Sequence, residues 1–151
     1  MKLALDTSFL VAFFVPSDAS HAAAETLVNE ILNGHVEYAC MSYLNVAEMG
    51  YILERIFDSQ TYAYHCMMAA VHDLSADVLD VSWDFLTTLA HLKAVNPISF
   101  CDNATIASAA LTDSAALFIR EKEIVARSRE RIQGAEVLFL DEIQLPPAPE
   151  E

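Results

Sequence analysis

Glycine is scarce in this chain of 151 residues: only three occur, while hydrophobic residues make up 54%. This composition excludes disordered and collagen-like chains and favours a compact, helix-rich domain. Long apolar runs are also missing, since the uncharged stretch 7–17 is much shorter than the roughly 20 residues that cross a membrane. A secretory leader is not expected, because Asp6 interrupts the first apolar residues. We therefore expect a cytoplasmic protein with no membrane segment.

Pairs of cysteines at metal-binding spacing are absent as well. Cys40, Cys66 and Cys101 are far apart, and the five histidines show no zinc-type spacing. An odd number of dispersed cysteines indicates reduced, mostly buried thiols. A zinc site and a disulfide framework are both excluded from the expected architecture.

Basic residues are few, with eight Lys and Arg against 22 Asp and Glu, which gives a net charge of -14. Such a charge argues against a protein that grips nucleic acid over a wide basic surface. Five of the eight lie within residues 120–131, namely Arg120, Lys122, Arg127, Arg129 and Arg131. They form either the solvated face of a helix or a local track for phosphates beside an acidic site, and charge alone does not decide between these.

Short apolar segments alternate with helical patterns along the chain. The expected strands are residues 2–5, 36–41, 78–81, 115–119 and 137–140. The expected helices are residues 9–15, 20–32, 43–57, 60–74, 83–95, 104–111 and 122–132. Thr7 or Ser8 is expected to cap the first helix. The alternation predicts one α/β domain over residues 1–145, with a parallel sheet covered on both faces and a loose acidic, proline-rich tail at 146–151.

Four acidic residues fall at related places in this pattern. Asp6 follows the first strand, Glu48 lies early in the helix after the second, Asp102 starts a helix and Glu121 follows the fourth strand. In an open parallel sheet, ligands bind at the carboxyl ends of the strands. Carboxylates that converge there repel one another unless a cation lies between them, and oxygen-only ligands select a hard ion such as Mg²⁺ or Mn²⁺.

Each acid also has an ordinary structural explanation. Asp6 and Asp102 could be helix caps, the commonest use of Asp at such positions. Glu48 could belong to a solvated helix face, although its neighbours are apolar. Glu121 could pair with Arg120 or Lys122. The shared position of the four acids, rather than any one of them, favours a metal site.

Four segments resemble the motifs of PIN-domain nucleases, in particular ribonuclease toxins of the VapC type. Residues 3–8 (Leu-Ala-Leu-Asp-Thr-Ser) resemble the first motif, and Ser42 with residues 46–49 (Val-Ala-Glu-Met) the second. Residues 98–107 (Ile-Ser-Phe-Cys-Asp-Asn-Ala-Thr-Ile-Ala) resemble the third, the most diagnostic. Residues 117–121 (Leu-Phe-Ile-Arg-Glu) stand in place of the fourth.

The resemblance covers essentially the whole chain and implies a three-layer α/β/α sandwich with a parallel sheet of about five strands. It implies a metal-dependent endoribonuclease that hydrolyses RNA phosphodiester bonds with Mg²⁺ or Mn²⁺, the toxin of a toxin–antitoxin system. The expected catalytic residues and metal ligands are Asp6, Glu48, Asp102 and Glu121. The expected RNA contacts are Thr7, Ser8, Arg120, Lys122 and Arg127. A homodimer and a cognate antitoxin, whose Arg pairs with the carboxylates, are the implied partners.

The chain departs from the family pattern at three positions. Ile119 replaces a usual Thr, Glu121 replaces Asp, and Asn103 stands where a small residue is common. These departures leave open a binding module that has kept the shape and lost activity, or a free-standing RNA-processing nuclease. A phosphatase with a DxD pair is disfavoured, because Ser8 stands where the second Asp should be.

Overall fold

A parallel sheet of five strands in the order β3-β2-β1-β4-β5 organises the computed structural model, which describes residues 1–120 and 129–144. The strands are β1 (Lys2–Leu5), β2 (Tyr38–Ser42), β3 (Asp77–Leu79), β4 (Ala115–Phe118) and β5 (Val137–Phe139). The helices are α1 (Thr7–Phe14), α2 (His21–Leu32), α3 (Tyr43–Phe57), α4 (Gln60–Asp73), α5 (Trp83–Val95) and α6 (Phe100–Thr112), with a short 3-10 helix at Leu140–Glu142. The predicted α/β class and parallel sheet are confirmed.

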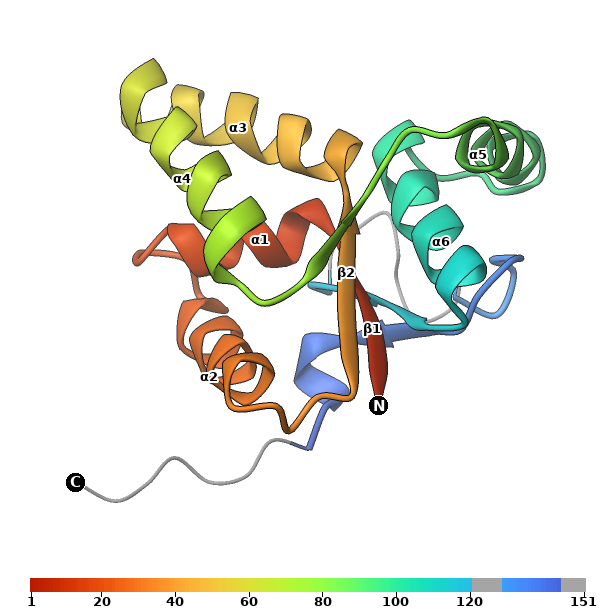
Figure 1. Ribbon diagram of the computed structural model, residues 1–151, viewed down its shortest axis with the longest axis horizontal. Helices are drawn as coiled ribbons and strands as arrows, with labels where there is room; N and C mark the ends of the chain where they lie inside the picture. Colours follow the sequence, from red (N-terminus) through yellow and green to blue (C-terminus); the bar gives the residue numbers. More distant parts are fainter. Residues whose placement is uncertain (121–128, 145–151) are drawn as a thin grey trace.

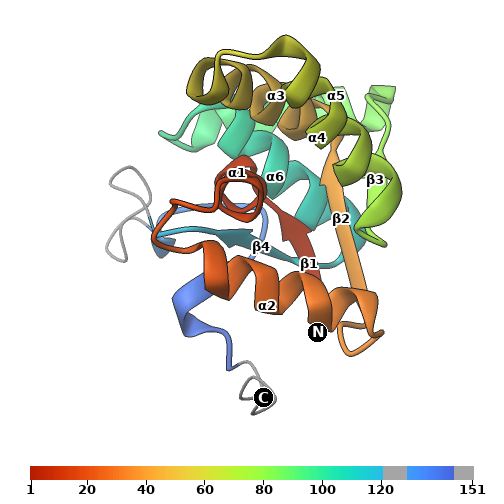
Figure 2. The same cartoon turned by 90° about the vertical axis from the view of Figure 1, so that its left-hand side faces the viewer.

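Helices cover both faces of the sheet, as Figures 1 and 2 show. Alternate residues of a strand point to opposite faces. Leu3 and Leu5 of β1 accordingly pack in one core with residues of α1 to α4, whereas Ala4 packs in a second core with α5 and α6. The strands are apolar on both sides because neither face meets water, which is the reason why the sequence shows short unbroken apolar runs.

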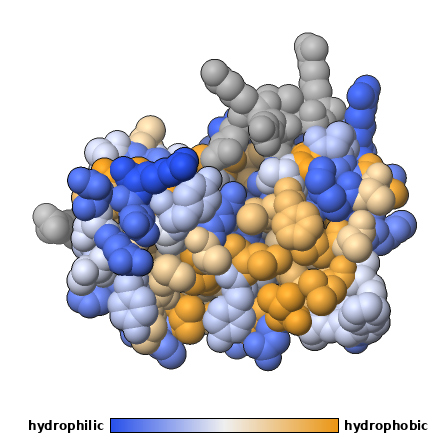
Figure 3. All heavy atoms as spheres, turned by 90° about the horizontal axis from the view of Figure 1, so that it is seen from above, coloured by the Kyte–Doolittle hydropathy of each residue, from blue (hydrophilic) through white to orange (hydrophobic). Residues whose placement is uncertain are grey.

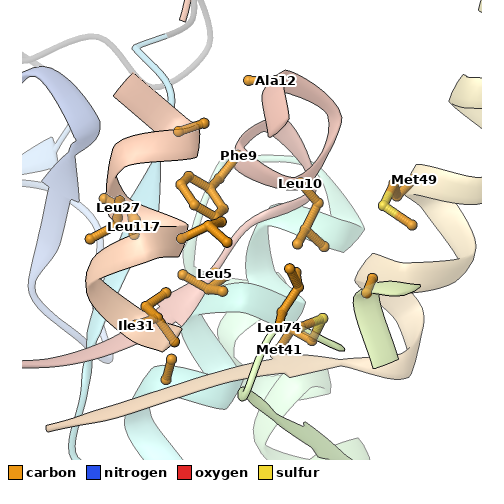
Figure 4. Close-up of a cluster of buried hydrophobic side chains, with 14 of the residues drawn as sticks. Leu5, Phe9, Leu10, Ala12, Leu27, Ile31, Met41, Met49, Leu74 and Leu117 are labelled. Carbon is orange, nitrogen blue, oxygen red and sulfur yellow. The ribbon is translucent and has the colours of Figure 1, made fainter. Parts of the chain in front are cut away.

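The core beneath α1 holds the site-bearing elements together (Figure 4). Phe9 and Leu10 of α1 are fully buried and pack in the same cluster as Leu5 of β1, Leu117 of β4 and Met49 of α3. Full burial of each such side chain contributes about 1.5–3 kcal/mol. This packing fixes the start of α1 against the ends of β1 and β4.

The carboxyl ends of β1 and β4 are neighbours at the point where the strand order changes direction. The chain runs from β1 outward through β2 and β3, then returns to place β4 on the other side of β1. The backbone N–H of Asp6 donates to the Leu117 carbonyl over 3.0 Å and extends this pairing by one residue. A topological switch point of this kind is the usual ligand position in a parallel α/β sheet.

Two local expectations were wrong. Asp6, rather than Thr7 or Ser8, caps α1, because its carboxylate accepts from the Ser8 backbone N–H over 2.8 Å. Helix α6 begins at Phe100, four residues before the predicted start, because Ser99 caps it. The predicted helix 122–132 lies mostly outside the described residues. Within the described part of the chain, no helix is long and apolar enough to cross a bilayer.

Candidate active site

A pocket of about 230 Å³ lies at the carboxyl edge of the sheet. Its lining comes from α1, the following turn, α3, α6 and the end of β4, namely Asp6, Thr7, Ser8, Val11, Asp18, Glu48, Ile52, Asp102 and Ile119. The structure therefore brings together the three acids from the first three motifs. Among the residues that the structure describes, no lysine or arginine lines this pocket.

Asp6 lines this pocket and is only 2% exposed. Its Oδ2 accepts from the Ser8 N–H over 2.8 Å and from the Ser8 hydroxyl over 2.7 Å, and its Oδ1 accepts from the Thr105 hydroxyl over 2.7 Å. Burial raises the pKa of Asp6 to about 7, and the negative charge of Asp102 adds to this against the opposing hydrogen bonds. Among residues 1–120 and 129–144, no basic side chain in the pocket offsets the charge of ionised Asp6.

Asp102 is half-buried on the first turn of α6 and forms a capping box with Ser99. Its backbone N–H donates to Ser99 Oγ over 3.0 Å, and its Oδ2 accepts from the Ser99 N–H over 3.3 Å. Ser99 is therefore the N-cap, while Asp102 occupies the position of the usual capping-box Glu. The carboxylate of Asp102 thus takes part in the capping box of α6 and also lines the pocket.

Glu48 lies on α3 and lines the pocket beside Cys101, a thiol that is also close to Asp6 and Asp102. Burial raises the pKa of the Cys101 thiol, and together with the charge of Glu48, the hydrogen bond that Glu48 accepts from it and the charges of Asp6 and Asp102 it brings this pKa to about 12. Cys101 is thus a protonated thiol that donates to Glu48 beside the pocket. The sequence analysis had considered Cys101 only as a buried thiol.

A buried amide, Asn45, connects the first three motifs, and the sequence analysis missed it. Its Nδ2 donates to the Thr7 hydroxyl (3.1 Å), the Thr105 hydroxyl (2.9 Å) and the Cys101 carbonyl (3.3 Å), while its Oδ1 accepts from Ser42 Oγ (2.5 Å). Asn45 and Thr105 are fully buried. A possible signal was the position of an Asn, three residues before Glu48, in an otherwise apolar part of the helix.

A fourth carboxylate, Asp18, also lines the pocket and was not predicted. It lies in the turn between α1 and α2, where its Oδ1 accepts from the Ser20 N–H over 2.7 Å. No motif marks this residue, because only the fold of the turn brings it beside Asp6. Val11, Ile52 and Ile119 supply the apolar part of the wall.

The donor chemistry of the pocket fits a hard divalent ion, although its acids are not drawn tightly together. The acidic residues in the lining are Asp and Glu, whose carboxylate oxygens are the ligand type that Mg²⁺ and Mn²⁺ prefer. Within residues 1–120 and 129–144, no three acidic, histidine or thiol side chains are grouped closely enough to hold a metal ion as they stand. The excess negative charge and the raised pKa of Asp6 are what a cation would relieve.

Comparison with known proteins gives the family of the chain. A family model for the PIN domain matches residues 3–130. The chain belongs to the PIN domain family. No curated protein matches its sequence.

Solved structures of toxins and toxin–antitoxin complexes share the fold of this PIN domain. VapC20 of Mycobacterium tuberculosis, described as a toxin that cleaves the sarcin-ricin loop, is 19% identical over 77% of this chain and 87% of its own, with a TM-score of 0.62. VapBC2 of Rickettsia felis, bound to a promoter DNA fragment, is 15% identical over 92% and 98%, with a TM-score of 0.62. A toxin–antitoxin complex from Klebsiella pneumoniae is 14% identical over 89% and 95%, with a TM-score of 0.57.

The predicted basic contacts of the PIN domain are only partly within the described residues. Arg120 donates to both carboxylate oxygens of Asp141 over 2.9 and 3.2 Å and to Glu142 over 3.1 Å, and its guanidinium lies 4.4 Å from the centre of the Phe139 ring. It lines a neighbouring hollow of about 260 Å³ that shares Ile119 with the acidic pocket. Glu121, Lys122 and Arg127 lie outside the described residues.

The PIN domain also carries an exposed apolar surface between α5 and α6. Figure 3 shows apolar side chains gathered on the upper face, on the side of these two helices. A hollow of about 350 Å³ there is lined almost entirely by apolar atoms, from Trp83, Leu86, Thr87, Leu89, Ala90 and Phe100. Trp83 is 77% exposed and Phe100 51%. Contiguous exposed apolar patches often mark sites of protein–protein contact.

Proposed function

We propose that this PIN domain is a metal-dependent endoribonuclease that hydrolyses RNA phosphodiester bonds. The observation that carries the proposal is the meeting of Asp6, Glu48 and Asp102, from three separate segments, in one pocket without a basic residue among the described lining. These three acids are the proposed metal ligands and catalytic residues, and Glu121 is a fourth that remains a prediction from the sequence. The proposed ion is Mg²⁺ or Mn²⁺.

The proposed reaction divides the work between the ion and the residues of the chain. A bound divalent ion supplies a polarised water and positive charge for the phosphate in the transition state. Asp6 is held by hydrogen bonds to both of its oxygens, so it is oriented before any ligand arrives. Glu48 and Asp102 border the same pocket from α3 and α6, so their carboxylates would hold the ion together with Asp6.

RNA would enter beside residues that already have internal partners. Thr7 and Ser8 line the pocket, yet the Thr7 hydroxyl points to the Asn45 carbonyl at 3.4 Å and the Ser8 hydroxyl donates to Asp6. Arg120 borders the adjoining hollow and offers a guanidinium for a flanking phosphate, for which it would exchange one carboxylate partner. Lys122 and Arg127 remain proposed contacts on sequence grounds.

The proposed biological role is that of a toxin held in check by a cognate antitoxin, with the toxin itself a homodimer. Support comes from the fold shared with VapC20 and with toxin–antitoxin complexes. A protein partner would bury the apolar surface between α5 and α6. The acidic pocket would attract an Arg from such a partner. The alternative of a free-standing RNA-processing nuclease uses the same pocket without the antitoxin.

The decisive experiment compares wild type with Asp6→Asn and Asp102→Asn on a panel of structured and single-stranded RNAs. Cleavage is expected with Mg²⁺ or Mn²⁺, to be lost with EDTA and to fall by at least about 100-fold in both variants. Asp84→Asn, an exposed change in the first turn of α5 outside the pocket, is the matched control and should retain the wild-type rate. Equal rates for wild type and Asp6→Asn would rule out the assignment.

Binding of Mn²⁺ separates a nuclease from an inactive relative. By calorimetry, wild type should bind Mn²⁺ and Asp6→Asn should bind it much more weakly. Saturating Mn²⁺ should also stabilise wild type by about 2.7 kcal/mol at 100 times the dissociation constant. A wild-type protein that neither binds Mn²⁺ nor cleaves RNA would instead support the binding module that has lost activity.

A further inference from the structure

Two hydroxyl groups orient Asp6, and the oxygen of each accepts a hydrogen bond from a further group. Thr105 Oγ1 donates to Asp6 Oδ1 over 2.7 Å and accepts from Asn45 Nδ2 over 2.9 Å. Ser8 Oγ donates to Asp6 Oδ2 over 2.7 Å and accepts from the Ile119 backbone N–H over 3.1 Å. A hydroxyl has a single proton. Because each of these oxygens already accepts a hydrogen bond from another group, its own proton is directed to Asp6.

The orientation of the Asn45 amide follows from its neighbours. The Cys101 carbonyl can only accept, so the Asn45 atom that faces it over 3.3 Å is the NH₂ group. On the opposite side, Ser42 Oγ accepts from the Asn45 backbone N–H and donates its proton to Asn45 Oδ1. The amide is therefore locked with both Nδ2 protons toward Thr7, Thr105 and Cys101.

Thr105 has one other acceptor within reach, the Cys101 carbonyl at 3.4 Å. The contact with Asp6 is 0.7 Å shorter (3.4 less 2.7 Å), and a carboxylate is the stronger acceptor. Without Asn45, Thr105 Oγ1 would lose the donor that holds it in place, and only its contact with Asp6 would then keep its proton from the carbonyl of its own helix.

We propose that Asn45 is a positioning residue that fixes the Asp6 carboxylate for metal binding and catalysis through the hydroxyl of Thr105. This inference rests on the proposed nuclease function and deepens it. We call the chain of hydrogen bonds from Asn45 through Thr105 to Asp6 the relay. Asn45 comes from α3, Thr105 from α6 and Asp6 from the end of β1, so the relay also sets the mutual placement of the three motifs. Partners that orient metal ligands in this way typically contribute 10- to 100-fold, in rough terms, to metal affinity or activity.

The test is a double-mutant cycle with Asn45→Leu and Thr105→Val, two substitutions of similar size that remove the relay at different points. Each should lower kcat about 10- to 100-fold and weaken Mn²⁺ binding in calorimetry to a similar degree. The KM for RNA should change by less than about 3-fold, because neither side chain reaches the substrate. Because both act on the same carboxylate oxygen, the double variant should be no worse than the poorer single variant.

Asn96→Leu is the matched control for loss of a buried amide. Asn96 is 2% exposed, donates to the Gln133 carbonyl over 3.0 Å and to Asn103 Oδ1 over 3.2 Å, accepts from the Gln133 N–H over 2.9 Å, and does not line the pocket. It should lower the melting temperature as Asn45→Leu does and leave kcat and Mn²⁺ affinity unchanged. Combined with Thr105→Val, its effect on kcat should be simply multiplicative.

If Asn45→Leu does not fold, Asn45→Asp decides the question with the shape retained. In its ionised form the introduced carboxylate accepts only and cannot donate to Thr105, which should then turn its proton away from Asp6, with the same loss of Mn²⁺ affinity. A crystal structure of either variant reports the relay without reference to activity, since the Thr105–Asp6 contact should lengthen beyond hydrogen-bond distance.

Two results would overturn the inference. One is a folded Asn45 variant with wild-type kcat and Mn²⁺ affinity and an unchanged Thr105–Asp6 contact. The other is an Asn45→Leu effect that multiplies with that of Thr105→Val. A wild-type protein without RNA cleavage would count against the proposed function instead, and the Mn²⁺ titrations and crystal structures would still test the relay.

Discussion

Thr105 donates its hydroxyl proton to Asp6 over 2.7 Å, although 99 positions separate the two residues in the sequence. This contact ties the N-cap of α1 to the middle of α6 inside the protein, where Asp6 is only 2% exposed and Thr105 is fully buried. A hydrogen bond to a carboxylate contributes more than one between neutral groups. The contact therefore fixes both the orientation of Asp6 and the packing of the two helices.

The raised pKa of Asp6 predicts a specific pH dependence of stability in metal-free protein. The folded state holds the proton up to about pH 7, whereas the unfolded chain releases it near its ordinary value of 3.8. The free energy of unfolding should therefore fall as pH rises from about 4 to 7 and level off above, with Asp6 contributing on the order of 4 kcal/mol to the total decrease.

Urea denaturation in EDTA between pH 4 and 8 measures this dependence. Asp6→Asn should flatten the decline and be as stable as wild type, or more so, above pH 7. The same substitution should abolish stabilisation by Mn²⁺. A curve for Asp6→Asn parallel to that of wild type, as expected for the control Asp84→Asn, would contradict the prediction.

Helix capping and metal chemistry should separate at the start of α6. Ser99→Ala removes the N-cap hydroxyl that accepts from Asp102 N–H and should destabilise the protein by about 1 kcal/mol while cleavage persists. Asp102→Asn should abolish cleavage with a smaller effect on stability. Denaturation and RNA cleavage of both variants check this, and a large destabilisation with retained cleavage in Asp102→Asn would leave capping as its only role.

Arg120 is expected to contact RNA phosphate beside the pocket. Arg120→Gln should raise the KM for RNA by about 3- to 10-fold and reduce the salt dependence of binding by about one charge, with Mn²⁺ affinity unchanged. Arg55→Gln, a change on α3 where Arg55 lies over the Tyr51 ring, is the control. Filter binding at several salt concentrations gives the slope, and identical slopes for wild type and Arg120→Gln would exclude the contact.

Gly134 should be required where the chain approaches α5 and enters β5. Its φ of +109° is unfavourable for other residues, and an added Cβ would lie 2.5 Å from Leu92 Cδ2 and 3.1 Å from Ile106 Cγ2. Gly134→Ala should cost about 2–4 kcal/mol from strain and overpacking. Gly34→Ala, with a φ of +74° but no atom within 4 Å of the new Cβ, should cost only about 1–2 kcal/mol. Equal losses in urea denaturation would show that the Leu92 contact is relieved.

Local patterns predicted most of the fold. The strands were predicted within a few residues because apolar runs on a sheet covered on both faces need no distant information to be recognised. The cap of α1 was assigned to the wrong residue, because Asp6, Thr7 and Ser8 can all cap a helix and only the backbone geometry selects Asp6. The start of α6 was placed too late because Phe100 and Cys101 looked like part of the preceding segment.

The site divides in the same way. Asp6, Glu48 and Asp102 could be proposed from strand ends and motif order, and the structure places them around one pocket. Asp18 could not be proposed, since its place in the lining depends on how the turn after α1 folds back. Asn45 and Thr105 carry no charge, and although Thr105 lies within the third motif, the sequence did not reveal which groups they contact.

The sequence by itself determined the alternation of strands and helices, the acidic character of the site and the family to which the chain belongs. These properties depend on the identity and short-range spacing of residues, which determine backbone preference and charge directly. The tertiary structure alone decided the burial of Asp6 and the relay from Asn45 through Thr105 to Asp6, whose two links join residues 60 and 99 positions apart. Desolvation and the direction of a hydroxyl proton depend on every group packed around an atom, and only the folded chain brings those groups together.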